Sequence, residues 1–379
     1  MSGNYAAVSD VLVTEVCSRR DTRQFINFPN ELFKNVPTYI PPLLRDEMGL
    51  LTSKNPSLEH CDFKMFLAYR GKKVVGRVAA IINRTCNEVW NKKCVRFGWC
   101  DFIDDYRVFE SLINKVIDFG KEHGMNEIEG PMGFTDMDKE CWMINNFDNR
   151  QNLSTLYNPK YYIDFLERKG FEIKCRWQQF KVRADQEIPE KISRLGEIVK
   201  EKYNLRVKKF KSHKELLPFG NKFFHTLNCS FKELFDFVPL TEKEIDVYVK
   251  EYFPFANLDF TTFVVDDDDN LVAFGFGIPS LNKAYQKAKG RLFPFGWFHL
   301  LRALHTYEEI DLLLVGVHPD WQKKGVHAIF YADMNRNVIK HGIKTAYTNP
   351  QIMGFEAVKI WSKYNGEELM QRAVFGKSI

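Results

Sequence analysis

One strand–loop–helix pattern in the C-terminal half constrains the fold more than any other feature of the sequence. An apolar run with strand character covers 310–317 and stops before Pro319. A short loop ends at Gly325, and apolar residues near helical spacing follow over 326–341. A strand that feeds a tight loop and then a helix is typical of an α/β domain.

The loop of this pattern predicts a binding site for a phosphate group. The first amides of a helix lack partners inside the helix and lie at the positive end of its dipole, so they favour an anion. Gly325 has no side chain, which lets a phosphate approach the backbone. The loop therefore indicates a ligand that carries phosphate.

The segment 317–327 resembles the coenzyme A loop of the GNAT superfamily of N-acyltransferases. The family pattern reads Val-x-Pro-x-x-[Gln/Arg]-x-x-Gly-x-[Gly/Ala]. The matching residues are Val317, Pro319, Gln322 and Gly325. His327 departs from the pattern, because it stands where a small residue is usual.

The resemblance implies a cofactor site made largely of backbone groups. The strand residues would pair with the pantetheine arm of coenzyme A, and the loop amides would hold its pyrophosphate. The predicted cofactor-binding residues are Val315, Val317, Gln322, Lys323, Lys324, Gly325, Val326, His327 and Asn349. Acetyl-CoA or another acyl-CoA is the expected co-substrate, and no metal is expected.

Transfer of an acyl group from a thioester to an amine needs a base for the ammonium and an acid for the leaving thiolate. The resemblance places the base at Asp311, with Glu308 and Glu309 as alternatives, and the acid at Tyr364. A base here needs a pKa raised by partial burial. The structural alternatives are a solvent-exposed carboxylate for Asp311 and helix packing for Tyr364. The match to the family is imperfect on this helix, because Trp361 takes the position where the family's ring is usual.

The order of predicted elements occurs twice along the chain. A hairpin at 66–76 corresponds to a hairpin at 263–273, and the strands and helices that follow each hairpin have the same order. The sequence therefore predicts an α/β fold with a mixed sheet, built from two tandem GNAT-like domains at 1–190 and 191–379.

The two halves differ where the cofactor would bind. The N-terminal half lacks the Gln-x-x-Gly loop and has acidic residues at 104–105, which would repel a pyrophosphate, so we expect it not to bind coenzyme A. The C-terminal half has an insertion at 281–301, basic first and aromatic afterwards. This insertion fits a membrane-surface element, a lid over an acyl or acceptor pocket, or a loop that covers the interface between the halves.

Composition narrows the class of partner. Hydrophobic residues make up 45% of the chain, which is ample for folded cores. A net charge of +5 without a basic stripe gives no case for nucleic acid. The sequence has no signal pattern, no apolar run near the ~20 residues that cross a bilayer, and only scattered cysteines. We expect a cytoplasmic protein that acts on a small-molecule amine, with membrane contact as the less favoured possibility.

Three functions remain open from the sequence. The first is an N-acyltransferase that moves an acetyl or other acyl group from an acyl-CoA thioester to the amine of a small-molecule or amino-acid-like acceptor by direct attack. The second is a catalytically inactive, GNAT-derived binding protein, which His327 favours. The third is a long-chain acyltransferase that uses acyl-CoA or acyl carrier protein near a membrane surface, which the aromatic insertion favours.

Overall fold

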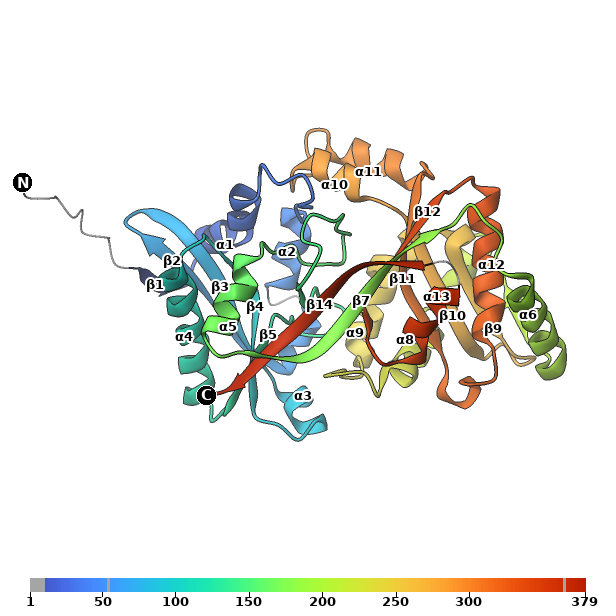
Figure 1. The fold of residues 1–379 in the computed structure, drawn as a ribbon, viewed down its shortest axis with the longest axis horizontal. Coiled ribbons are helices and arrows are strands. Elements are labelled where there is room, and N and C mark those ends of the chain that lie inside the picture. Colours follow the sequence, from blue (N-terminus) through green and yellow to red (C-terminus); the bar gives the residue numbers. More distant parts are fainter. Residues whose placement is uncertain (1–10, 53–54, 364–365) are drawn as a thin grey trace, which may run out of the picture. The chain divides into compact units, whose positions relative to one another are not determined.

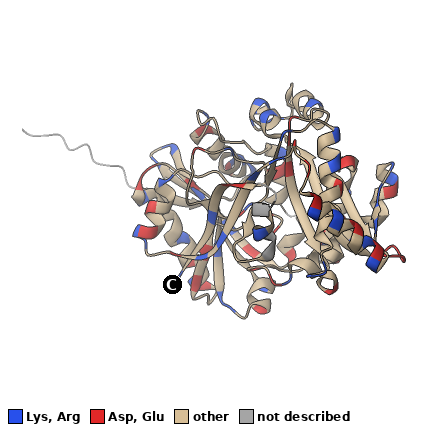
Figure 2. Ribbon diagram, turned by 45° about the vertical axis from the view of Figure 1, so that its right-hand side comes forward, with Lys and Arg blue, Asp and Glu red and all other residues tan. Residues whose placement is uncertain are grey.

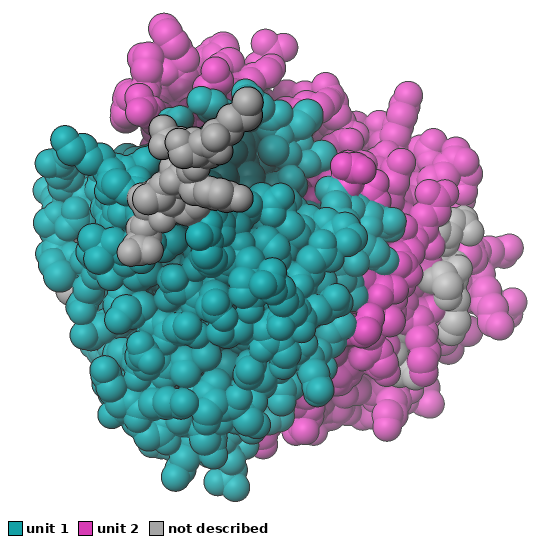
Figure 3. Space-filling model, turned by 60° about the vertical axis from the view of Figure 1, so that its left-hand side comes forward, with its two compact units in different colours: residues 1–147, 156–174, 373–379 teal, residues 148–155, 175–372 magenta. Residues whose placement is uncertain are grey.

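The computed structural model describes residues 11–52, 55–363 and 366–379. The chain folds into two compact units, and each unit is built from segments that are not contiguous in the sequence (Figures 1 and 3). Unit 1 comprises residues 1–147, 156–174 and 373–379, and unit 2 comprises residues 148–155 and 175–372. No helix within the described ranges combines the length and apolar character that a membrane crossing requires.

Unit 1 is an α/β unit with helices on both faces of its sheet. Its strands are β1 (Leu12–Glu15), β2 (Cys61–Arg70), β3 (Lys73–Asn83), β4 (Cys94–Phe102), β5 (Glu127–Gly130), β6 (Trp142–Met143) and the end of β14 (Gly366–Ser378). Its helices are α1 (Arg19–Leu32), α2 (Leu44–Leu50), α3 (Arg84–Val89), α4 (Tyr106–Glu122) and α5 (Tyr161–Arg168), with a 3-10 turn η1 (Pro56–Glu59). Along the order β1-β2-β3-β4-β5-β14, neighbouring strands are antiparallel except for the parallel pair β4–β5.

The central strand β3 shows why both faces are covered. Successive side chains of a strand point to opposite faces. Val78, Ala80 and Ile82 pack in the core that includes α4, whereas Ala79 and Ile81 pack in the core that includes α1. An unbroken apolar strand therefore has two helical layers to pack against, as in other sheets buried on both sides.

Unit 2 repeats this plan. Its strands are β7 (Glu172–Arg183), β8 (Arg206–Lys208), β9 (Thr261–Val265), β10 (Leu271–Pro279), β11 (Glu309–Val317), β12 (Thr345–Thr348) and β13 (Gln351–Ile352). Its helices are α6 (Glu190–Tyr203), α7 (His213–Leu216), α8 (Gly220–Phe231), α9 (Glu242–Tyr252), α10 (Asn282–Ala288), α11 (Gly296–Leu304), α12 (His327–Lys340) and α13 (Glu356–Lys363). Four 3-10 turns complete it, η2 (Leu217–Phe219), η3 (Phe253–Phe255), η4 (Leu258–Phe260) and η5 (Pro319–Trp321).

The pairing of strands follows the same rule in both units. In unit 2 the order is β7-β12-β11-β10-β9-β8, and β11–β12 is the parallel pair. The hairpin β9–β10 leads to β11 as β2–β3 leads to β4. The predicted α/β fold with a mixed sheet is confirmed.

Two long strands, β7 and β14, pass from one unit to the other. Residues 175–183 of β7 belong to unit 2, and residues 373–378 of β14 belong to unit 1. Within unit 1, the end of β14 (red in Figure 1) pairs antiparallel with β5. The last strand of unit 1 therefore comes from the C-terminal end of the chain. The predicted division at residue 190 concerns the sequence repeat and stays a prediction.

Because β14 completes unit 1, we expect Phe375→Ala to destabilise a unit that lies mostly in the first half of the sequence. Phe375 is 1% exposed in the unit 1 core, and truncating a buried Phe costs about 3–5 kcal/mol. Urea unfolding with hydrogen exchange would measure this, with faster exchange expected in β4 and β5. Ser378→Ala at an exposed position of the same strand is the control. Unchanged exchange in unit 1 would contradict the expectation.

Candidate functional site

The sheet of unit 2 forks between β11 and β12. Their parallel pairing ends at Leu312 and Thr348, and the last bond runs from the Asn349 N–H to the Leu312 carbonyl at 2.9 Å. The chain after β12 then pairs with β7 through β13, whereas β11 stays paired with β10 as far as Val317. The two strands therefore part after four residues.

A β-bulge lies at the point of the fork. Phe276 of β10 pairs with Leu314, and the next residue, Gly277, pairs with Leu312. Leu313 is therefore an extra residue on β11. A bulge of this kind changes the side toward which the following backbone groups point.

Beyond the bulge, β11 has an edge that faces into the fork. The His318 N–H donates to the Val272 carbonyl at 2.8 Å, so these two residues form a hydrogen-bonded pair. Because such pairs alternate along an antiparallel ladder, Val317 and Val315 direct their N–H and C=O groups away from β10. The Gln322 side chain donates to the Val317 carbonyl at 3.2 Å, on this outer side. An extended ligand can add hydrogen bonds to an edge of this kind.

Unit 1 fills the equivalent edge with its own side chains. The hairpin registers place Phe102 of β4 where Val317 lies in β11. The Phe102 N–H donates to the Tyr162 hydroxyl at 2.8 Å, and the Tyr161 hydroxyl donates to the Phe102 carbonyl at 2.7 Å. Most of β4 is buried, whereas residues 312–317 of β11 are half-buried. In unit 1 this strand position is thus filled at both backbone groups. In unit 2 the Gln322 side chain bonds the Val317 carbonyl, and among the described residues nothing bonds the Val317 N–H.

The start of the following helix also differs between the units. In unit 1, the Asp105 carboxylate accepts from the Arg107 N–H at 2.9 Å and pairs with Arg70 at 2.6 Å. The protein's own carboxylate therefore occupies the amides at the start of α4. In unit 2 the corresponding helix, α12, begins after Val326, whose side chain has no group that caps a helix.

The loop between β11 and α12 has left-handed backbone at two positions, Lys323 with φ of 61° and Gly325 with φ of 81°. Residues of opposite backbone hand in succession turn their amides toward one concave side, which favours an anion. Any side chain at Gly325 would combine a strained backbone with a contact of 3.3 Å to Val199. The predicted phosphate loop therefore lies, as expected, at the N-terminus of a helix.

Two other predicted loop residues lie beside aromatic rings. The Lys324 ammonium lies 4.7 Å from the centre of the Trp321 ring and 5.7 Å from that of Tyr203. His327 is the first residue of α12, half-buried, with its ring centre 6.4 Å from that of Tyr331. The imidazole thus lies in the first turn of the helix.

Arg150 organises a polar cluster at the closed end of the fork. Its guanidinium donates to the Ser280 hydroxyl at 2.6 Å and to the Asp311 carboxylate at 3.1 Å. It lies 3.2 Å from the Glu309 carboxylate and 3.9 Å from the centre of the Tyr347 ring. We call these five residues the Arg150 cluster, and all belong to unit 2.

Strand geometry explains why these side chains meet. Glu309 and Asp311 are two residues apart on β11 and share one face, while Ile310 between them packs in the core with α12. Tyr347 pairs with Asp311 in the parallel register, so it lies on the same face. A single guanidinium can therefore reach both carboxylates and the ring.

Burial controls the charge state of Asp311, which is 1% exposed. Burial raises the pKa of its carboxyl, while the charge of Arg150 and hydrogen bonds from Arg150 and Ser280 act in the opposite direction. The alternative of a solvent-exposed carboxylate is therefore wrong. Glu308, one of the alternative bases, is exposed and pairs with Lys283 at 2.6 Å.

The Arg150 cluster contains a free donor and has a free acceptor beside it. Among the described residues, neither the buried Arg150 Nη1 nor the buried Asn282 Oδ1 has a hydrogen-bond partner. The two residues are linked, because the Asn282 amide donates to the carbonyl of Gln151, the neighbour of Arg150, at 2.7 Å. Buried polar atoms without partners are rare in native structures, so these two atoms mark the cluster as a candidate site.

Sequence reasoning missed the loop 148–155, which brings Arg150 to the cluster. The loop also binds Asn349, whose side-chain oxygen accepts from Asn152 at 3.0 Å and from Ser154 at 2.6 Å. Asn349 thus lies beside the cluster, held by the loop. The available signal was a run of polar residues without helix or strand periodicity.

Tyr364, the predicted acid, lies outside the described residues. Trp361, nearly one turn earlier on α13, is 2% exposed, and its indole N–H donates to the Gln351 side chain at 2.8 Å. Its ring packs against those of Phe180 and Tyr331. Trp361 is therefore a core residue of unit 2.

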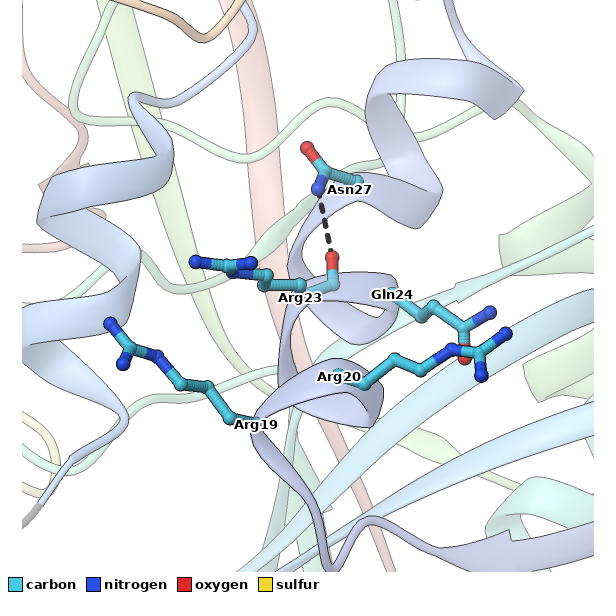
Figure 4. A pocket seen from close by; sticks show the side chains of 5 residues that line it. All are labelled: Arg19, Arg20, Arg23, Gln24 and Asn27. Atoms are coloured by element: carbon cyan, nitrogen blue, oxygen red, sulfur yellow. Dashed lines mark hydrogen bonds between the residues drawn. The ribbon is translucent and has the colours of Figure 1, made fainter.

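Unit 1 has a surface pocket of about 330 Å³ beside α1 (Figure 4). Its lining residues are Arg19, Arg20, Arg23, Gln24 and Asn27. Figure 4 shows the Arg20 guanidinium pointing away from those of Arg19 and Arg23. The charges do not converge on one point, so this pocket is a weaker candidate than the Arg150 cluster.

Nowhere in the described ranges do three His, Cys, Asp or Glu side chains gather in a way that could hold a metal ion. The expectation that no metal takes part stays a prediction.

The chain is similar in sequence to two named bacterial proteins. No family model matches the chain. It is 27% identical over 317 residues to Protein YghO of Escherichia coli K12, which covers 82% of this chain and 80% of that protein. It is 25% identical over 325 residues to the bacterial ceramide synthase of Caulobacter vibrioides, with 83% and 82% covered.

A solved structure decides the fold. A tandem GNAT protein from the clavulanic acid biosynthesis pathway superposes with a TM-score of 0.55, covering 97% of this chain and 98% of that one at 10% identity. The chain has a tandem GNAT fold. The resemblance seen at residues 317–327 therefore extends, as a fold, over the whole chain, and the predicted pair of GNAT-like units is confirmed.

The raised pKa of Asp311 predicts a pH dependence of stability. The folded protein holds this proton more tightly than the unfolded chain, so the contribution of Asp311 is fully present below the unfolded pKa and is lost as the pH rises through the folded pKa. We expect Asp311→Asn to gain stability relative to wild type as the pH rises above about 4, the ordinary pKa of an aspartate. Denaturant unfolding across this range measures it, with the exposed Asp246→Asn as control. A constant difference between Asp311→Asn and wild type would contradict the assignment.

Proposed function

We propose that the chain is an acyl-CoA-dependent N-acyltransferase with its working site in unit 2. The observation that carries this proposal is the open edge of β11, which continues directly into the loop at the N-terminus of α12. The pantetheine arm of coenzyme A is an extended chain of amides that suits a strand edge, and its pyrophosphate suits helix amides. One ligand would therefore use both features, and the tandem GNAT fold supports this function.

In the proposed reaction, the amine nitrogen attacks the thioester carbonyl, and the carbon–sulfur bond breaks as the amide forms. A backbone N–H beside the bulge at Leu313 stabilises the negative charge on the carbonyl oxygen. Asp311, two residues before the bulge, takes the proton that the ammonium loses, and its raised pKa suits that role. The thiolate takes a proton from Tyr364.

Arg150 and Asn282 would position the acceptor. The free Arg150 Nη1 donates to an oxygen of the acceptor, and the free Asn282 Oδ1 accepts from a hydroxyl or amide. An acceptor without such a group would leave two buried polar atoms unpaired, which costs affinity. We therefore propose an amine whose neighbouring atoms include a hydroxyl or a carbonyl group.

Unit 1 supplies structure in this proposal. Its edge is filled by Tyr161 and Tyr162, and the start of its helix α4 is occupied by Asp105. One coenzyme A per chain is the expected stoichiometry.

The variant Val315→Pro tests the strand-edge contact. The Val315 N–H points into the fork, so proline removes it while the ladder to β10 remains. We expect acetyl-CoA to bind roughly tenfold or more weakly by calorimetry. Val315→Ala, which keeps the N–H, is the matched control and should bind normally. Equal binding by both variants would remove the strand edge from the site.

The variants Asp311→Asn and Glu309→Gln separate binding from chemistry. We expect Asp311→Asn to bind acetyl-CoA normally while transfer falls by about 10²-fold or more, and Glu309→Gln to retain more activity. Release of the coenzyme A thiol in the presence of primary amines measures transfer. Loss in Glu309→Gln alone would move the base to that residue. Binding of coenzyme A without transfer from any acyl-CoA would favour the inactive binding protein.

A second candidate is a long-chain acyltransferase. It is favoured by the relative named bacterial ceramide synthase, because a ceramide is the amide of a fatty acid and a long-chain amino alcohol. A long-chain amino alcohol also carries a hydroxyl beside its amine, as the free donor and acceptor require. Activity with palmitoyl-CoA and sphinganine, but not with acetyl-CoA and amino acids, would support it. The reverse preference would overturn it.

A further inference from the structure

The insertion between β10 and β11 forms a hairpin of two helices, α10 and α11, in residues 281–307. Its base is closed by a hydrogen bond from the Ser280 N–H to the Glu309 carbonyl at 2.9 Å and by the ion pair of Lys283 with Glu308 at 2.6 Å. We call these residues the 281–307 hairpin. It begins and ends beside two members of the Arg150 cluster.

The outer side of the hairpin is apolar, contrary to the usual pattern of a surface helix. The exposed fractions are 76% for Phe293, 72% for Phe295, 44% for Trp297, 51% for Phe298 and 51% for Leu301. On α11, Trp297, Phe298 and Leu301 lie one and four residues apart and share one side of the helix. Clustered exposure of large apolar side chains marks an interaction surface.

The same hairpin is strongly cationic. It carries five Lys and Arg residues and no Asp or Glu, whereas the whole chain has a net charge of only +5. Lys287, Lys289, Arg291 and Arg302 are exposed, and in the described structure none of them forms an ion pair. Figure 2 marks the Lys and Arg positions of the chain in blue and the Asp and Glu positions in red. The net charge of the hairpin equals the net charge of the whole chain, so positive and negative residues balance in the rest of the sequence.

We propose that the 281–307 hairpin docks the protein on an anionic membrane surface. The phenylalanines and Trp297 enter the boundary between headgroups and acyl chains, and the cations meet lipid phosphates. Charge complementarity selects this occupant. A second copy of the chain would bring the four unpaired cations of one hairpin against the four of the other, which opposes a symmetric dimer through this surface.

Docking would give unit 2 a direct route to lipid substrates. The hairpin emerges between Ser280 and Glu309, and both contact Arg150. The hairpin that would contact the bilayer is therefore joined at both of its ends to residues that contact Arg150. The docking itself does not rest on the proposed function, since it needs neither coenzyme A nor acyl transfer.

Flotation of the full-length protein with vesicles tests the proposal. We expect binding to vesicles of phosphatidylcholine with phosphatidylglycerol and much weaker binding to phosphatidylcholine alone. The double variant Phe293→Ser, Phe295→Ser should lose roughly tenfold or more in affinity for the anionic vesicles. The matched control is Phe255→Ser, because Phe255 is 69% exposed elsewhere in unit 2. Circular dichroism would verify that each variant is folded.

Two further measurements separate insertion from simple charge attraction. Vesicles should shift the tryptophan emission of the wild type to the blue, and Trp297→Phe should abolish the shift. The triple variant Lys287→Gln, Lys289→Gln, Arg291→Gln should lose the preference for anionic lipid. Full binding by the Phe293→Ser, Phe295→Ser variant, absence of wild-type binding, or a dimer that these serines dissociate would overturn the proposal. Acyl transfer is not part of these assays, so their failure leaves the proposed function standing.

Discussion

The candidate site of unit 2 depends on the separation of β11 from β12, which leaves backbone groups of β11 without a neighbouring strand. Backbone N–H and C=O groups inside a protein must find partners, and a strand that loses its neighbour leaves a row of them open. In unit 1 the same edge is closed, because hydroxyls of Tyr161 and Tyr162 bond both backbone groups of Phe102. The two units thus share one framework and differ in whether the unit's own side chains bond both backbone groups at this strand position or, as at Val317, only the carbonyl.

The position of the Arg150 guanidinium depends on the same strand, β11. A cation near the interior is tolerated when carboxylates pair with it. Alternation along β11 supplies two of them, Glu309 and Asp311, on one face. The arrangement leaves one guanidinium nitrogen without a hydrogen-bond partner among the described residues, and the proposed acceptor would bind this atom. The 281–307 hairpin connects the end of β10 to the start of β11, and it exposes large apolar side chains of the kind that most proteins bury.

Much of the fold could be read from local patterns. The strand–loop–helix order around Gly325, the repeated hairpins and the basic–aromatic insertion all depend on residues close in sequence, where periodicity and backbone preferences act. Asp311 could be named for the same reason, since it lies on the strand that the pattern defines. Its hydrogen-bond partners Arg150 and Ser280, however, come from two other segments of the chain.

The sequence alone determined the α/β class, the tandem repeat and the loop at the start of α12, because these follow from local spacing. Tertiary structure decided which edge is open, because that depends on where Tyr161 and Tyr162 reach and where β12 turns away. It also decided that the loop 148–155 belongs to unit 2 and that β14 completes unit 1. Such contacts join residues far apart in the chain, and no local periodicity records them.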